Sequence, residues 1–168
     1  MLPVQILLNN LLYDVSEIPI PLDSVDEEYL SHPRHWNMKF IRNFMLSVGP
    51  VSSIFDFLTF YIMLHVFHAG EKLFHTGWFI ESMATQVLVI FIIRTRRNPL
   101  KSRPNRWLTL CSLLIVSLAV VLPFTPPGRY FGFVPPPLSF YAILTCLVFF
   151  YLFAVEGIKQ WFFRRFAE

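Results

Sequence analysis

The stretch LSFYAILTCLVFFYLFAVEGI, residues 138–158, carries one charged residue, Glu156. At a rise of about 1.5 Å per residue, a helix of this length crosses about 30 Å, the thickness of a bilayer's hydrocarbon core. Only two charges, Asp56 and Glu81, interrupt the other long apolar runs. These runs are Phe44–Phe67, Thr76–Ile93 and Trp107–Phe124. The pattern predicts four transmembrane helices.

The composition supports a membrane protein. The chain has 168 residues, of which 55% are hydrophobic and 15% charged, whereas soluble domains carry about 25% charged residues. Nineteen Phe cannot all be packed into one small aqueous core. The net charge of +3 could suggest nucleic acid, but the basic residues concentrate between the apolar runs. We therefore expect the lipid bilayer as a partner and no nucleic acid.

A fifth span is predicted at the start of the chain. Residues 1–13 are apolar apart from three amides, and a helix that reaches about Ile18 would place Asp14 inside the membrane. Pro19 and Pro21 then stop it. The expected fold is an all-α membrane protein, one domain over residues 1–168. Its five spans lie at approximately residues 1–18, 44–67, 76–93, 107–124 and 138–158.

The distribution of Lys and Arg predicts the orientation. If the spans alternate and the loop Arg94–Arg106 is cytoplasmic, twelve of the fourteen basic residues face the cytoplasm, and only Lys72 and Arg129 lie outside. Cytoplasmic loops of membrane proteins carry such an excess. The N-terminus is then outside and the C-terminus cytoplasmic. A first span that starts at residue 1 with no preceding signal leads us to expect part of a longer membrane protein.

Asn10 and Asp14 are the first candidate site. They are four residues apart and share one helix face, and carboxylate and amide oxygens suit Mg²⁺ or Ca²⁺. An ionisable residue inside a membrane is a functional hypothesis by default. Spacing alone leaves a second interpretation equally open, in which Asp14 lies at the interface and caps the helix. Asn9 faces about 100° away from Asn10, which favours a helix contact over a ligand.

The order Leu-Pro-x-Gln-x-Leu-x-x-Asn-Leu-x-x-Asp, residues 2–14, resembles the sixth transmembrane helix of P-type ATPases. Four later segments are similar to bacterial magnesium-transporting members of that family: RNFM (42–45), GPVSSIFD (49–56), TGWFIES (76–82) and IRTR (93–96). The closing residues RRF (164–166) fit as well. The resemblance covers the whole chain in order, helices six to ten. Tyr13 stands where calcium pumps have Thr, which weakens a transfer of calcium-pump coordination.

The resemblance implies that Asn10 and Asp14 are ligands of a transported Mg²⁺, and it places Glu81 where relatives have a site-facing Glu. An interfacial Glu81 is the alternative. For Asp56, structural hydrogen bonding and a transport role stay equally open. The acidic run at residues 23–28 is either a solvated face or, as the resemblance implies, a contact with the phosphorylation domain. Glu156 is interpreted as an i,i+3 partner of Lys159, and His65, His68 and His75 as solvent-facing residues of an outer loop, because magnesium does not favour imidazole.

The sequence lacks the DKTGT, TGE and GDGxND motifs of these pumps. We therefore expect no catalytic residue, no ATP site and no ATP hydrolysis by this chain alone. The leading hypothesis is a membrane-domain fragment that imports Mg²⁺ across the bacterial inner membrane together with the N-terminal part of the pump, in cis or as a separate chain. The alternative is a membrane scaffold or interaction protein that has lost transport.

Overall fold

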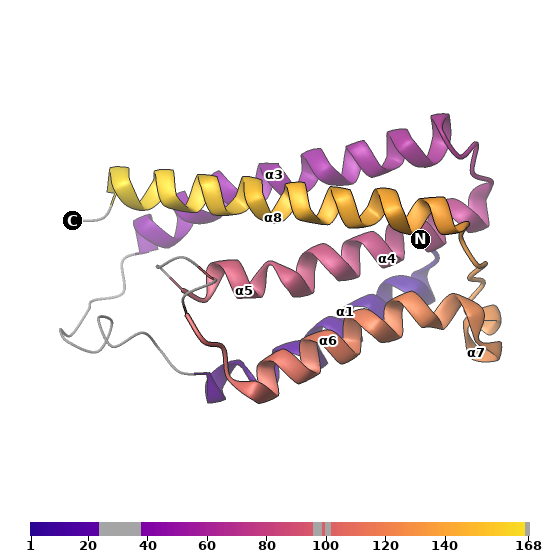
Figure 1. Cartoon of the computed structure of the whole chain (residues 1–168), viewed down its shortest axis with the longest axis horizontal. Helices are drawn as coiled ribbons and strands as arrows, with labels where there is room; N and C mark the ends of the chain where they lie inside the picture. Colours follow the sequence, from indigo (N-terminus) through magenta and orange to yellow (C-terminus); the bar gives the residue numbers. More distant parts are fainter. Residues whose placement is uncertain (24–37, 96–98, 100–101, 167–168) are drawn as a thin grey trace.

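The computed structural model describes residues 1–23, 38–95, 99 and 102–166 (Figure 1). Every regular element in these ranges is helical, which confirms the all-α prediction. The helices in chain order are α1 (Pro3–Glu17), η1 (Ile20–Leu22), α3 (Met38–His65), α4 (Glu71–Leu88), α5 (Ile90–Ile93), α6 (Arg106–Val121), η2 (Leu122–Phe124), α7 (Pro126–Tyr130) and α8 (Leu138–Phe166).

Four helices of the described chain are long and apolar enough to cross a membrane. They are Met38–His65, Glu71–Ile93, Arg106–Phe124 and Leu138–Arg165. The first predicted span folds as the 15-residue helix α1, which would reach about 22 Å. The fifth crossing therefore stays a prediction.

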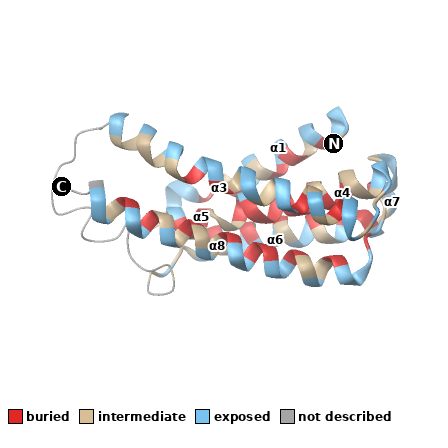
Figure 2. Cartoon of the chain, turned by 90° about the horizontal axis from the view of Figure 1, so that it is seen from above, coloured by how far each residue is buried: buried red, intermediate tan, exposed pale blue. Residues whose placement is uncertain are grey.

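Helix α4 occupies the centre of the bundle and packs against α1, α3, α6 and α8. In its most apolar stretch 56% of the residues are buried, against 17% to 33% in the other three long helices. Figure 2 shows buried positions concentrated along α4, while the outer helices turn exposed positions outward. Polar side chains in this stretch of α4 are therefore held mostly inside protein.

Small residues allow this central position. Gly77, Ala84 and Thr85 are all buried on α4, and small side chains let membrane helices approach closely. A Cβ added at Gly77 would lie 2.6 Å from Met63 Cε of α3. The hydrophobic core around this contact includes Phe79, Met83 and Phe140, so α4 joins α3 and α8 here.

One end of the bundle collects the basic helix ends. The end of α5, the start of α6 and the end of α8 lie together, opposite the turn between α3 and α4 (Figure 1). The basic residues described at this end include Arg94, Arg103, Arg106, Arg164 and Arg165. Several residues of the predicted cytoplasmic loops, among them Arg34, Arg96, Arg97 and Lys101, lie outside the described ranges.

Candidate functional site

Helix α1 has one packed face and one open face. Gln5, Asn9, Leu12 and Ser16 are buried and repeat at helical spacing, so they form the face toward α4 and α6. Gln5 fixes the start of the helix, because its Nε2 donates to the carbonyl oxygen of Phe131 at 2.8 Å. The polar buried face therefore serves packing within this chain.

The predicted ligands Asn10 and Asp14 lie on the open face of α1. Both are exposed, as are the apolar Leu7, Leu11 and Ile18 around them. At about 100° per residue, Asp14 points almost directly away from Leu12 of the packed face. The two oxygen-bearing side chains share a face as their spacing predicts, and no described segment of this chain covers them.

Asn9 is confirmed as a helix contact. Its Nδ2 donates to Oε1 of Gln86 on α4 at 3.2 Å, and its side chain is 5% exposed. The buried Oδ1 of Asn9 has no hydrogen-bond partner among the described residues. This contact joins α1 to α4 through amides.

Glu81 is buried, with 2% of its surface exposed, at the middle of the central helix. Its carboxyl lies within hydrogen-bonding reach of the Asp56 carboxyl of α3, and the Trp78 side chain of α4 lies near Asp56. The carboxyl thus turns to α3 and not to the open face of α1. The structure brings Glu81 together with Asp56, whereas Asn10 and Asp14 stay apart from both.

The polar neighbours of this pair were missed by the sequence argument. Thr59 is buried on α3, and Tyr151 of α8 shares a hydrogen bond of 2.9 Å with Ser52 of α3. Ser52, Asp56 and Thr59 recur at positions i, i+4 and i+7 of α3, which places them on one stripe of the helix. That spacing was the available signal.

The chain directly after η1 is clamped to the neighbouring helices through Asp23. Its carboxylate accepts two hydrogen bonds from the Arg94 guanidinium, one from Nε and one from Nη2 at 3.2 Å. It also accepts the backbone N–H of Asn105 at 2.8 Å. One carboxylate therefore holds the ends of η1 and α5 and the start of α6 together. Residues 24–28, the rest of the predicted acidic run, lie outside the described ranges.

The Glu156–Lys159 pair is confirmed, with 2.6 Å between Glu156 Oε2 and Lys159 Nζ. The lysine is fully buried, and its ammonium also donates to the carbonyl oxygens of Ile92 at 3.0 Å and Thr95 at 3.2 Å. Lys159 therefore caps the end of α5 from α8.

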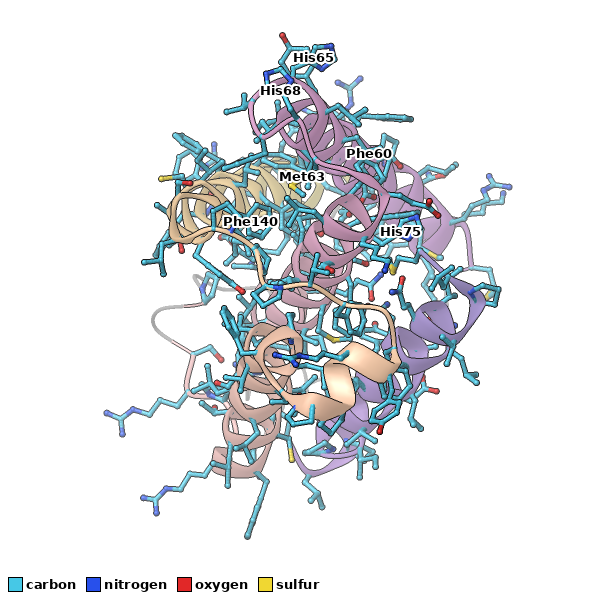
Figure 3. All side chains as sticks on the ribbon, turned by 90° about the vertical axis from the view of Figure 1, so that its right-hand side faces the viewer. Phe60, Met63, His65, His68, His75 and Phe140 are labelled. Atoms are coloured by element: carbon cyan, nitrogen blue, oxygen red, sulfur yellow. The ribbon has the colours of Figure 1, made fainter. Side chains whose placement is uncertain are left out.

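The histidines gather at the opposite end. His65 and His68 lie together at the tip of the α3–α4 turn, and His75 is set apart on α4 (Figure 3). The first two are exposed and His75 is partly buried. Within the described part of the chain no group of three or more His, Cys, Asp or Glu side chains could hold a metal ion. The surface interpretation is thus confirmed for His65 and His68.

Residues 1–161 match the family model for the cation transporting ATPase C-terminus. The chain belongs to this family. It is 39% identical over 173 residues to the magnesium-transporting ATPase, P-type 1, of Salmonella typhimurium strain LT2, an alignment that covers 100% of this chain and 19% of that protein. The protein of the same name from Escherichia coli K12 is 38% identical over 172 residues, 99% of this chain and 19% of its own length.

The chain thus spans about a fifth of the length of these relatives. It corresponds to the C-terminal membrane portion of the cation-transporting ATPases. An open helix face with two oxygen-bearing side chains fits such a portion, because other parts of a larger pump can cover it.

Proposed function

We propose that this chain is the C-terminal membrane portion of a P-type ATPase that imports Mg²⁺ into the cytoplasm across the bacterial inner membrane. The similar proteins from Salmonella and Escherichia coli are named magnesium-transporting ATPases. In this proposal α1 is the first of five spans, and the rest of the pump, in cis or as a separate chain, supplies phosphorylation by ATP.

The open face of α1 carries the proposal. Asn10 and Asp14 are exposed there beside Leu7 and Leu11. Lipid would leave a carboxylate and an amide without partners at membrane depth, so such groups face protein or a water-filled path. Oxygen ligands suit a hard cation. Asn10 and Asp14 on this face, with Glu81 from the central helix, are proposed to contribute part of the intramembrane cation path.

The test is growth of a bacterium that lacks its magnesium transporters and co-expresses this chain with the preceding part of the pump. Asp14→Asn removes the charge and keeps the shape, so we expect loss of growth at low Mg²⁺ and loss of ²⁸Mg uptake. Glu71→Gln is the matched control, because Glu71 is an exposed carboxylate in the first turn of α4.

The scaffold alternative predicts the opposite result. A chain that has lost transport would support the same growth with or without the Asp14 carboxylate, and uptake would not depend on co-expression of the chain. Equal uptake by the unchanged chain and Asp14→Asn would therefore sink the transport proposal.

A further inference from the structure

A carboxyl pair joins α3 and α4, away from the open face of α1, with Glu81 buried and Asp56 partly exposed. Asp56 of α3 and Glu81 of α4 are within hydrogen-bonding reach of each other. Neither carboxyl has an ion-pair partner among the residues that the structure describes. Two acidic groups that face each other inside protein need a positive charge or a proton between them.

The packing register places a third oxygen at the pair. Helices α3 and α4 are joined by a short turn and run antiparallel (Figure 1). Near that turn Met63 of α3 meets Gly77 of α4, and Figure 3 shows Met63 directed into the bundle beside Phe140. One helical turn farther from the connection, Thr59 on α3 comes opposite Glu81 on α4.

Two oxygens at this position are without partners. Thr59 is 1% exposed and its Oγ1 has no hydrogen-bond partner among the described residues, and the same is true of the buried Oε2 of Glu81. Unsatisfied buried oxygens destabilise a fold, so each requires an explanation. Thr59 lies on α3 and Glu81 on α4, and the register of the two helices brings these two positions opposite each other.

We propose that Asp56, Thr59 and Glu81 bind a hard divalent cation between α3 and α4. Mg²⁺ is commonly held by one or two carboxylates while it keeps several waters, and this donor set is two carboxylates and a hydroxyl. The charge of the cation balances the two carboxylates, and the orphan oxygens become ligands of the ion or of its waters. The inference rests on the proposed function and deepens it, because Glu81 belongs to both, and it adds a cation position between α3 and α4.

The test uses Tb³⁺, a hard-cation probe whose emission is sensitised by a nearby indole. The Trp78 side chain lies near Asp56 and serves as the local antenna. The purified chain in lipid nanodiscs is expected to sensitise Tb³⁺ emission, and Mg²⁺ is expected to displace the probe. Trp78→Phe should remove most of the emission, whereas Trp161→Phe, an exposed indole on α8, should not.

Asp56→Asn and Glu81→Gln should each weaken Tb³⁺ affinity about tenfold or more. Thr59→Val keeps the shape of the side chain and removes only the hydroxyl. It should weaken Tb³⁺ affinity less than the carboxyl variants do, and its elution volume and unfolding transition should match those of the unchanged chain. The inference can therefore be tested even if a carboxyl variant fails to fold. Glu71→Gln, a change at an exposed carboxylate in the first turn of α4, should leave the affinity unaltered.

Three results would overturn the inference: the absence of sensitised emission, emission that survives both carboxyl variants, or a probe that Mg²⁺ cannot displace. Absence of emission would favour a proton shared between Asp56 and Glu81. The two proposals fail separately. If Tb³⁺ binds but Asp14→Asn does not change Mg²⁺ uptake, only the transport proposal is removed. If Asp14→Asn abolishes uptake but the chain binds no Tb³⁺, only the cation site between α3 and α4 is removed.

Discussion

At the scale of single residues, mostly buried charged side chains stabilise the basic end of the bundle through ion pairs and hydrogen bonds. Lys159 makes several of these interactions. It is fully buried and reaches from α8 to two carbonyl oxygens at the end of α5, and it also pairs with Glu156. A cation at a helix C-terminus stabilises the carbonyls that the helix itself cannot satisfy.

Lys159→Met should destabilise the chain by about 2–4 kcal/mol. Methionine keeps much of the length and apolar stem, but it leaves Oε2 of Glu156 and the two carbonyl oxygens without the ammonium that they contact. The measurement is reversible unfolding in mixed detergent micelles. Lys72→Met is the control, because Lys72 is exposed in the first turn of α4. Equal stability of the two variants would contradict the assigned role.

Asp23→Asn should weaken the clamp between η1, α5 and α6 by about 1–3 kcal/mol. The asparagine cannot accept both guanidinium hydrogen bonds of Arg94, whose side chain is 8% exposed against 11% for that of Asp23. Thermal unfolding measures the loss. A double-mutant cycle with Arg94→Gln should give a coupling energy of the same order, and additive effects of the two changes would argue against the clamp.

At the scale of elements, the connection between α6 and α7 depends on one glycine, Gly128. Thr125 caps α7, with its Oγ1 accepting the backbone N–H of Gly128 at 3.3 Å. A Cβ added at Gly128 would lie 2.0 Å from the carbonyl oxygen of Leu122. Because that neighbour is backbone, no side-chain rotation can relieve the clash.

Gly128→Ala should therefore destabilise the chain by about 1–3 kcal/mol, as overpacking does in well-packed interiors. Gly157→Ala is a matched control on α8, where an added Cβ meets nothing within 4 Å and alanine favours the helix. Unfolding curves of the two variants should separate clearly. A Gly128→Ala chain as stable as the control would show that the turn can shift without loss.

At the scale of the whole molecule, the bundle has two chemically different ends. Basic residues gather at the end where α5 stops and α6 begins, while the α3–α4 turn at the other end carries the exposed His65 and His68 (Figure 1). An excess of Lys and Arg marks the cytoplasmic side of membrane proteins. The asymmetry of the fold thus supports the predicted orientation.

Cysteine labelling in intact cells tests that orientation. In a background with Cys111→Ser and Cys146→Ser, Lys72→Cys should react with an impermeant maleimide from outside. Arg103→Cys should react only after the inner membrane is opened. Labelling of both positions from the same side would contradict the orientation and the alternation of spans.

Much of the fold could be predicted from apolar run length. The four long spans appear as helices, with α3 beginning at Met38 and α8 continuing to Phe166, beyond the apolar runs. Local spacing also predicted the Glu156–Lys159 pair and the contact role of Asn9. The candidate site could be predicted less well from the sequence. Spacing placed Asn10 and Asp14 on one helix face, but it did not show whether other helices cover that face.

The sequence by itself determined the all-helical class, the charge asymmetry of the two ends and the local pairs, because these depend on hydropathy and on residues within one or two helical turns. Only the tertiary structure decided that Glu81 meets Asp56, that Asp23 binds Arg94, and that Asn10 and Asp14 face away from the bundle. Apolar side chains cover much of every span, so hydropathy leaves the rotation of each helix open. Packing against neighbours sets that rotation, and it thereby selects which polar side chains meet.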